Sequence, residues 1–220
     1  MLTKYGYSTM AVVFFIVFIL IASAIFAPNP WLKYTLGGVA AFLTIFTLNF
    51  FRDPERVTPN EKDILISPAD GKIIVMKEVE EPNFIKGKAF QISVFMSPLN
   101  VHVNRIPVDG VVKFVRYVNG KFIAAFEDKA SSENERSEIG IESAHGKIFF
   151  TQVAGFVARR IVYELKENDT VKIGERFGMI KFGSRVDIIA PLDWIPNVKI
   201  GDMVTAGETI VFRHKKESGN

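Results

Sequence analysis

Two long apolar segments without a charged residue fill most of the first fifty positions of this chain. MAVVFFIVFILIASAIFA (residues 10–27) and YTLGGVAAFLTIFTLNFF (34–51) each have 18 residues. A helix needs about 20 apolar residues to cross the hydrocarbon core of a bilayer. Between the segments, Pro28-Asn29-Pro30-Trp31 supplies helix-breaking prolines and an aromatic ring suited to the membrane interface. Residues 1–51 are therefore predicted to form a membrane-anchoring helical hairpin.

The basic residues around this hairpin predict its orientation. Its ends are flanked by four basic residues, Lys4, Arg52, Arg56 and Lys62. Its turn contains one, Lys33. Because basic flanks favour the cytoplasmic side, the rest of the chain is expected in the cytoplasm, bound to the cell membrane. Two alternatives stay open. The first segment could be a cleaved signal peptide, since Ala22-Ser23-Ala24 resembles a cleavage site, or the helices could anchor without spanning.

The rest of the chain has the composition of a globular domain. All 24 acidic side chains and 25 of the 27 basic ones lie in residues 52–220. This balance argues against nucleic-acid binding, which needs a clustered basic excess. With no cysteine and three histidines, thiolate chemistry is excluded and a histidine-rich metal site is not expected. RDPERVTPNEKD (52–63) contains two prolines and is predicted to be a linker before a β domain at 64–220.

Short segments rich in β-branched and aromatic residues alternate with turn signals in this domain. They are KIIVM (72–76), FQISVFM (90–96), GVVKFVRYV (110–118), KIFFTQVAGFVARRIVYEL (147–165), MIKFGSRVDIIAP (179–191) and ETIVF (208–212). Asp-Gly at 70–71 and 109–110 and Asn-Gly at 119–120 predict hairpin-type turns. The predicted class is mainly β, with a barrel or sandwich architecture.

A repeated pattern in the domain resembles a known fold. VKIGERFG (171–178) and VKIGDMVTAG (198–207) each precede a predicted strand. Together with SPADGKI (67–73), they resemble the barrel-sandwich hybrid of lipoyl and biotinyl carrier domains, which present a modified residue on an exposed hairpin. Lys181, with a methionine two residues earlier, is placed like an attachment lysine. One hypothesis for the function is therefore a membrane-tethered carrier or binding module modified at Lys181.

Gly183-Ser184 interrupts the predicted strand MIKFGSRVDIIAP. Glycine weakens a strand interior, and a β-bulge or a tight turn is the ordinary explanation. The other explanation is chemical. A serine hydroxyl can attack the preceding carbonyl when that carbonyl is unhindered and the peptide is distorted, and glycine favours both conditions. Elimination from the resulting ester, followed by hydrolysis, would leave a pyruvoyl group, an electron sink comparable with pyridoxal phosphate.

A serine that attacks needs a base, and the base needs a group that orients it. His102 in SPLNVHVNRIP (97–107) and Asp70 in SPADG (67–71) are the candidates. The ordinary alternatives are a packed histidine for His102 and a turn residue for Asp70.

The remaining candidates have simpler explanations. His145 precedes a glycine in a predicted turn and His214 lies in the basic tail, so neither is expected to be catalytic. Arg105 and Arg185 could hold a phosphate group.

Five motifs in this order resemble those of the phosphatidylserine decarboxylase family in its short, membrane-anchored form. They are FFRDPER, SPADGKI, SPLNVHVNRIPVDG, ENER and GERFGMIKFGSRVDIIAP. The resemblance covers nearly the whole chain and implies self-cleavage between Gly183 and Ser184, into residues 1–183 and 184–220. It also implies that Ser184 becomes the pyruvoyl group, which forms a Schiff base with the substrate, and that Asp70 is a charge-relay residue.

The same resemblance implies the reaction and the partners. The substrate would be phosphatidylserine or a related serine phospholipid, decarboxylated to phosphatidylethanolamine without a metal or a diffusible cofactor. The two fragments would form a heterodimer at the membrane, and further oligomerisation is left open.

The histidine motif departs from that of longer family members, which carry two histidines three residues apart. His102 falls on the first position and Arg105 on the second, which is the relay histidine of the longer members. His102 could therefore serve self-cleavage, decarboxylation or both. Arg185 stands where longer members have a small hydroxyl residue. A serine hydrolase is a further alternative, although no G-x-S-x-G pattern surrounds Ser184.

Overall fold

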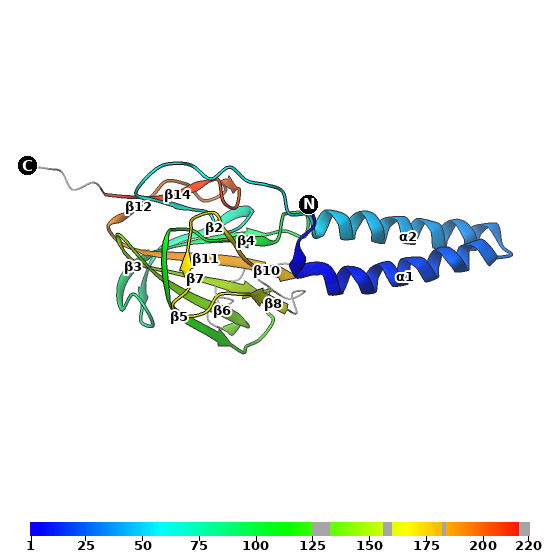
Figure 1. The fold of residues 1–220 in the computed structure, drawn as a ribbon, viewed down its shortest axis with the longest axis horizontal. Helices are drawn as coiled ribbons and strands as arrows, with labels where there is room; N and C mark the ends of the chain where they lie inside the picture. Colours follow the sequence, from blue (N-terminus) through cyan, green and yellow to red (C-terminus); the bar gives the residue numbers. More distant parts are fainter. Residues whose placement is uncertain (125–132, 156–159, 182–183, 216–220) are drawn as a thin grey trace, which may run out of the picture. The chain divides into compact units, whose positions relative to one another are not determined.

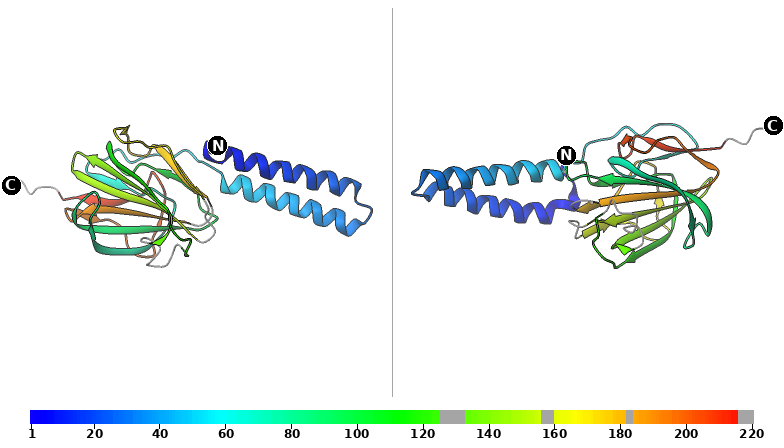
Figure 2. Two further views of the ribbon diagram at one scale, coloured as in Figure 1. Left: turned by 90° about the horizontal axis from the view of Figure 1, so that it is seen from below. Right: turned by 180° about the vertical axis from the view of Figure 1, so that it is seen from behind.

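The computed structural model describes residues 1–124, 133–155, 160–181 and 184–215. The chain divides into two compact units, Met1–Glu55 and Arg56–Asn220. The first unit contains a short 3-10 helix η1 (Lys4–Gly6) and two long helices, α1 (Tyr7–Phe26) and α2 (Pro30–Phe50). Figures 1 and 2 show α1 and α2 side by side and antiparallel.

The two long helices form as the sequence predicts. Helix α2 begins with Pro30 in its first turn, and the Asn29 side chain accepts a hydrogen bond from Trp31 N at 2.9 Å. Large apolar side chains such as Phe18 and Phe42 are exposed along the pair. With mean hydropathies of 2.9 and 1.3, both helices are long and apolar enough to cross a membrane. The predicted helical pair is confirmed, and its exposed apolar surface indicates membrane association.

In the described residues of the second unit, the named elements are all strands. In chain order they are β1 (Ile64–Ile66), β2 (Gly71–Glu81), β3 (Gly87–Met96), β4 (Val103–Arg105), β5 (Gly110–Val118), β6 (Arg136–Ser143), β7 (Gly146–Ala154), β8 (Arg160–Tyr163), β9 (Thr170–Val171), β10 (Arg176–Lys181), β11 (Ser184–Pro191), β12 (Trp194–Pro196), β13 (Met203–Val204) and β14 (Ile210–His214).

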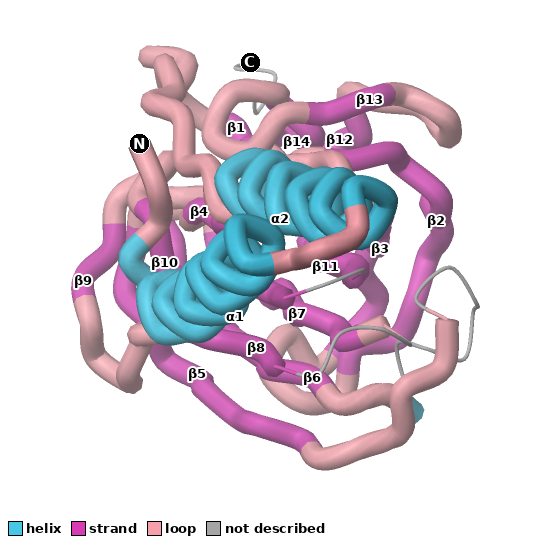
Figure 3. The backbone as a smooth tube through the Cα atoms, turned by 90° about the vertical axis from the view of Figure 1, so that its right-hand side faces the viewer, coloured by secondary structure: helices cyan, strands magenta, loops and turns pink. Residues whose placement is uncertain are grey.

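A curled, antiparallel sheet of eight strands makes up most of this unit. Its order is β13-β2-β3-β11-β7-β6-β5-β9, and its curvature is visible in Figure 3. Two three-stranded sheets, β1-β14-β12 and β4-β10-β8, complete the unit. The mainly β fold predicted from the sequence is confirmed.

The main hydrophobic core lies on one face of the eight-stranded sheet. Side chains alternate between the two faces of a strand. Along β11, Val186, Ile188 and Ala190 belong to this core, whereas Ile189 packs in a smaller cluster on the other face. Ser184, two positions before Val186, therefore points to the same face as the main core.

The Asp-Gly pairs do not form the hairpin turns that the sequence predicts. Gly71 and Gly110 are instead the first residues of β2 and β5. At Gly71 the neighbouring strand passes so close that an added Cβ would lie 2.1 Å from the carbonyl oxygen of Phe95. Glycine is thus required for a close approach between strands. A tight hairpin turn occurs at Ala144-His145, between β6 and β7.

Candidate active site

The chain changes sheet between Lys181 and Ser184, the described residues on either side of the predicted cleavage site. Strand β10 ends at Lys181 in the three-stranded sheet with β4 and β8. Strand β11 begins at Ser184 in the middle of the eight-stranded sheet, between β3 and β7. Gly183 lies outside the described residues. The strand predicted over 179–191 is therefore two strands of different sheets, with Gly183-Ser184 at their junction.

Ser184 is fully buried, with 0% of its surface exposed. Its Cα is paired with Met96 on β3 and with Ala154 on β7. Its hydroxyl donates to Met96 Sδ at 3.3 Å. Because a thioether sulfur is a weak acceptor, this contact orients the hydroxyl without engaging it strongly.

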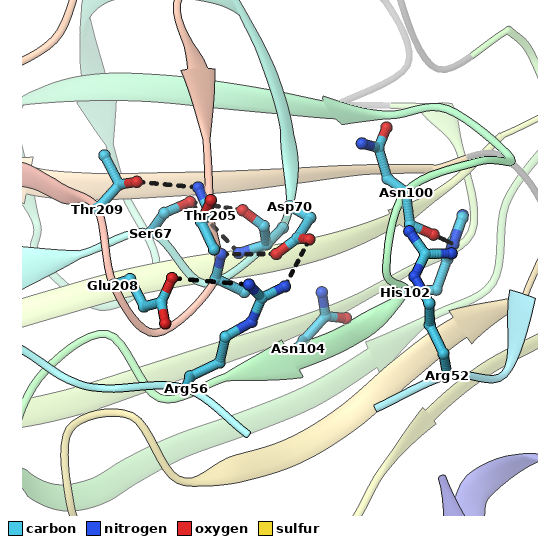
Figure 4. A network of polar contacts seen from close by, with 12 residues as sticks. Arg52, Arg56, Ser67, Asp70, Asn100, His102, Asn104, Thr205, Glu208 and Thr209 are labelled. Atoms are coloured by element: carbon cyan, nitrogen blue, oxygen red, sulfur yellow. Dashed lines mark hydrogen bonds and ion pairs between the residues drawn. The ribbon is translucent and has the colours of Figure 1, made fainter. Parts of the chain in front are cut away.

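His102 is fully buried just before β4, and its position fixes its tautomer. Its Nδ1 lies 2.9 Å from the carbonyl oxygen of Asn100, as Figure 4 shows. A carbonyl oxygen can only accept, so Nδ1 carries a proton, and in the neutral imidazole the lone pair is therefore on Nε2. The Asn100 side chain in turn accepts hydrogen bonds from Ser97 N at 2.9 Å and Ser97 Oγ at 2.7 Å. This turn therefore holds His102 in the tautomer that a general base at Nε2 requires.

Asp70 is held by an arginine and by a backbone amide. Its Oδ2 lies 2.8 Å from Arg56 Nη2, and its Oδ1 accepts from Ala206 N at 2.8 Å. In Figure 4 the Asp70 carboxylate turns toward Arg56, and His102 lies apart from it with Asn104 between them. The structure thus places both predicted residues in one region, while the bond that fixes the His102 tautomer goes to Asn100.

Three buried polar residues that sequence reasoning missed also lie in this region. Ser137 on β6, Gln152 on β7 and Asn104 on β4 are 0% exposed and are joined by hydrogen bonds. They carry no signal in the sequence, because serine, glutamine and asparagine are common at the surface. Only their burial in an apolar core distinguishes them.

The two predicted phosphate-binding arginines take part in the packing of the fold. Arg105 Nη1 donates to the carbonyl oxygen of Gly174 at 2.9 Å. Arg185 forms a buried ion pair with Asp187, with Nε 2.8 Å from Oδ1 and Nη2 3.2 Å from Oδ2. Since neighbouring residues of a strand face opposite sides, Arg185 points away from the face of Ser184. Phosphate binding by either arginine stays a prediction.

Lys181, the alternative attachment lysine, is 6% exposed at the end of β10. Burial lowers the pKa of its amine from the ordinary 10.5, and the positive charge of Arg160 lowers it further. A lysine that carries biotin or a lipoyl group must be reached by a modifying enzyme. Its burial therefore does not support the carrier hypothesis.

The other two histidines lie together, and each of them contacts an aspartate. Their rings stack with centroids 4.4 Å apart. His145 Nε2 lies 2.6 Å from Asp63 Oδ1, and His214 Nε2 lies 3.1 Å from Asp193 Oδ2.

A cavity of ≈ 410 Å³ adjoins His145, and none of its lining residues is Ser184, His102 or Asp70. Within the described ranges, no three His, Asp or Glu side chains form a group that could hold a metal ion.

Comparison with known proteins gives a consistent result. The family model described as phosphatidylserine decarboxylase matches residues 43–212. A protein named phosphatidylserine decarboxylase proenzyme from Chlorobium phaeovibrioides is 54% identical, over 84% of this chain and 84% of its own length. Proteins of the same name from Chlorobium chlorochromatii and Chlorobaculum tepidum are 48% and 46% identical. The alignments cover 97% and 96% of this chain, and 100% and 96% of those relatives.

Proposed function

Because the chain belongs to the phosphatidylserine decarboxylase family, we propose that it decarboxylates phosphatidylserine, or a related serine phospholipid, through a pyruvoyl group made from Ser184. The family makes the chain a decarboxylase. The observation that carries the finer proposal is the position of Ser184, buried at the junction of two sheets. The relatives are named proenzymes, which supports a processing step in this chain as well.

In the proposed processing step, the Ser184 hydroxyl attacks the carbonyl carbon of Gly183. The Oγ–C bond forms, the hydroxyl proton passes to a base, and the amide C–N bond breaks as its nitrogen takes up a proton. The product is an ester. β-Elimination then removes the Ser184 Cα proton and breaks the Cβ–Oγ bond, which releases Gly183 as a free carboxylate and leaves a dehydroalanine. Hydrolysis of the dehydroalanine gives the pyruvoyl group and ammonia. Every atom of the new group therefore comes from the chain and from water.

His102 is the proposed base for this attack. The bond from its Nδ1 to Asn100 places the lone pair on Nε2, which supports this role. Asp70 belongs to the proposal as the charge-relay residue that the family resemblance implies, and its carboxylate is paired with Arg56. Once protonated, the same imidazole could return a proton to the substrate Cα after carbon dioxide leaves.

The pyruvoyl group would supply the electron sink that decarboxylation requires. The described residues fit such a group, because Ser184 is 0% exposed between the apolar residues Met96 and Ala154, and burial protects a reactive carbonyl from water. The apolar helical pair would keep the enzyme at the membrane that contains its phospholipid substrate.

Denaturing mass spectrometry of the purified full chain tests the proposal. We expect wild-type protein to give fragments of 183 and 37 residues, the smaller one blocked by a pyruvoyl group, and Ser184→Ala to stay intact. A single intact species in wild-type protein that produces ethanolamine lipid would overturn the proposal.

Two histidine variants test the base in the same experiment. His102→Ala should slow cleavage by about 10²-fold or more, the usual contribution of a general base. His145→Ala is the matched control and should cleave at the wild-type rate. If His102→Ala cleaves normally but cannot decarboxylate, His102 is the proton donor and another group is the base.

A further inference from the structure

A line of buried polar side chains runs through the apolar core toward Ser184. Ser137 and Gln152 are paired across β6 and β7, and the Ser137 hydroxyl donates to Gln152 Oε1 at 2.8 Å. Gln152 Nε2 donates to Asn104 Oδ1, also at 2.8 Å. A buried polar group destabilises a core unless it is hydrogen-bonded, so a line of three calls for an explanation.

The contacts of Asn104, at one end of this line, determine which way the side-chain amides of Asn104 and Gln152 are oriented. Asn104 Nδ2 lies 3.4 Å from the carbonyl oxygen of Pro68 and 3.8 Å from Met96 Sδ. Both atoms can only accept, so the Asn104 NH₂ group must face them and its oxygen must face Gln152. The Asn104 NH₂ group is therefore presented to Met96 Sδ, the atom that also contacts the Ser184 hydroxyl.

The two ends of the Asn104 amide are bonded unequally. Its oxygen makes a short hydrogen bond, whereas its two N–H groups make long contacts at 3.4 and 3.8 Å. Such long contacts, one of them to a weak sulfur acceptor, leave most of the donor strength unused. A negatively charged oxygen forming beside Ser184 would be a much stronger acceptor, because charge-assisted hydrogen bonds are about twice as strong as neutral ones.

We propose that the Asn104 amide stabilises the oxyanion of self-cleavage, and that Gln152 and Ser137 position it. This inference rests on the proposed attack by Ser184. As Oγ bonds to the preceding carbonyl carbon, the π electrons of that carbonyl move onto its oxygen and the hydroxyl proton leaves to the base. Asn104 donates a hydrogen bond to the negative oxygen and keeps its own proton. One such donor typically accelerates a reaction by about 10²- to 10³-fold.

The other face of the same sheet offers a matched control. Gln91 Nε2 donates to Ser93 Oγ at 2.9 Å, and these side chains are 6% and 0% exposed. On β3 they alternate with Ile92 and Val94 of the main core, so they point away from the face of Ser184. Ser93→Ala and Ser137→Ala thus remove the same buried hydroxyl on opposite faces.

The test follows self-cleavage of the full chain after cell-free synthesis, by denaturing mass spectrometry. Asn104→Asp keeps the size of the side chain and an acceptor for Gln152, but replaces the donor by a carboxylate. We expect cleavage at least about 100-fold slower. Ser137→Ala should slow cleavage by about 2- to 10-fold, the worth of one hydrogen bond, and Ser93→Ala should match wild type.

The pH profile separates a donor from a merely structural residue. As the pH falls, the introduced carboxyl group becomes protonated and can donate again. The cleavage rate of Asn104→Asp relative to wild type should therefore rise as the pH falls. Melting temperatures in the uncleavable Ser184→Ala background show whether each variant folds.

Four outcomes would count against one claim or the other. Wild-type rates in Asn104→Asp would overturn the inference, and so would a relative rate that does not change with pH. If Asn104→Asp does not fold, equal rates in Ser137→Ala and Ser93→Ala would overturn it. A wild-type chain that never cleaves would overturn the proposed function itself.

Discussion

A single buried amine gives the clearest pH dependence at the scale of one residue. Lys181 is buried, and burial with the nearby charge of Arg160 lowers the pKa of its amine from 10.5. At pH values between the lowered pKa in the folded chain and the ordinary pKa in the unfolded chain, the unfolded chain binds more protons than the folded chain. The free energy of unfolding therefore rises with pH across this window. Below the window, the charged amine destabilises the fold.

Replacing this amine should stabilise the fold at neutral pH. In the Ser184→Ala background, we expect Lys181→Met to raise the free energy of unfolding, and the gain to shrink as the pH approaches 10.5. Urea denaturation at several pH values measures the trend, with exposed Lys199→Met as the control for the substitution itself. A gain that is constant over this range would contradict the assigned cause.

The chemistry of single residues could be predicted, but their partners could not. Ser184 and His102 carry reactive groups inside recognisable motifs. The partner of His102 Nδ1 is a backbone carbonyl, which depends on the turn that Asn100 forms. Asn104 meets Gln152, 48 positions away, only because β4 and β7 come together in the fold. Contacts between distant segments of this kind have no local pattern in the sequence.

At the scale of strands, the fragment that begins at Ser184 contributes strands to two of the three sheets of the β domain. Strand β11 pairs with β3 and β7, β13 pairs with β2, and β14 pairs with β1. Cutting the chain just before β11 removes none of these pairings. The fragments of 183 and 37 residues should therefore stay together after cleavage.

Size-exclusion chromatography tests this retention. Cleaved wild-type protein in mild detergent should elute as one species at the position of intact Ser184→Ala, and should separate into two chains only in denaturant. Dissociation of the small fragment in native buffer would show that these strand pairings do not hold it.

Local pattern predicted the strands rich in β-branched and aromatic residues, such as β5, which covers the predicted residues 110–118. It did not predict β6, whose sequence RSEIGIES contains more polar than apolar residues. In the structure Ile139 and Ile141 face the main core, Glu138 pairs with Arg136, and Gly140 lies against the Phe84 ring. Conversely, residues 179–191 look like one strand, because local sequence does not encode which sheet a strand joins.

At the scale of the whole chain, the helical pair and the basic residues around it together predict the membrane topology. Helices α1 and α2 are antiparallel, so a spanning pair would return the chain to the side from which it started. The basic residues at the two ends of the pair outnumber the one in its turn, Lys33. The positive-inside rule then predicts that both ends of the pair, and the β domain that follows, lie in the cytoplasm.

Protease protection in spheroplasts tests this topology. Protease added outside should leave the β domain intact, and should digest it once the membrane is opened with detergent, because the bilayer shields only what lies inside. A cytoplasmic marker and an externally exposed marker control for the integrity of the membrane. Digestion of the domain in sealed spheroplasts, with a mature chain that has lost its first apolar segment, would favour the signal peptide. An intact mass that includes that segment, together with protection, would favour the hairpin. The hairpin would then hold the decarboxylase on the cytoplasmic face, where it would reach the head group of the proposed phospholipid substrate.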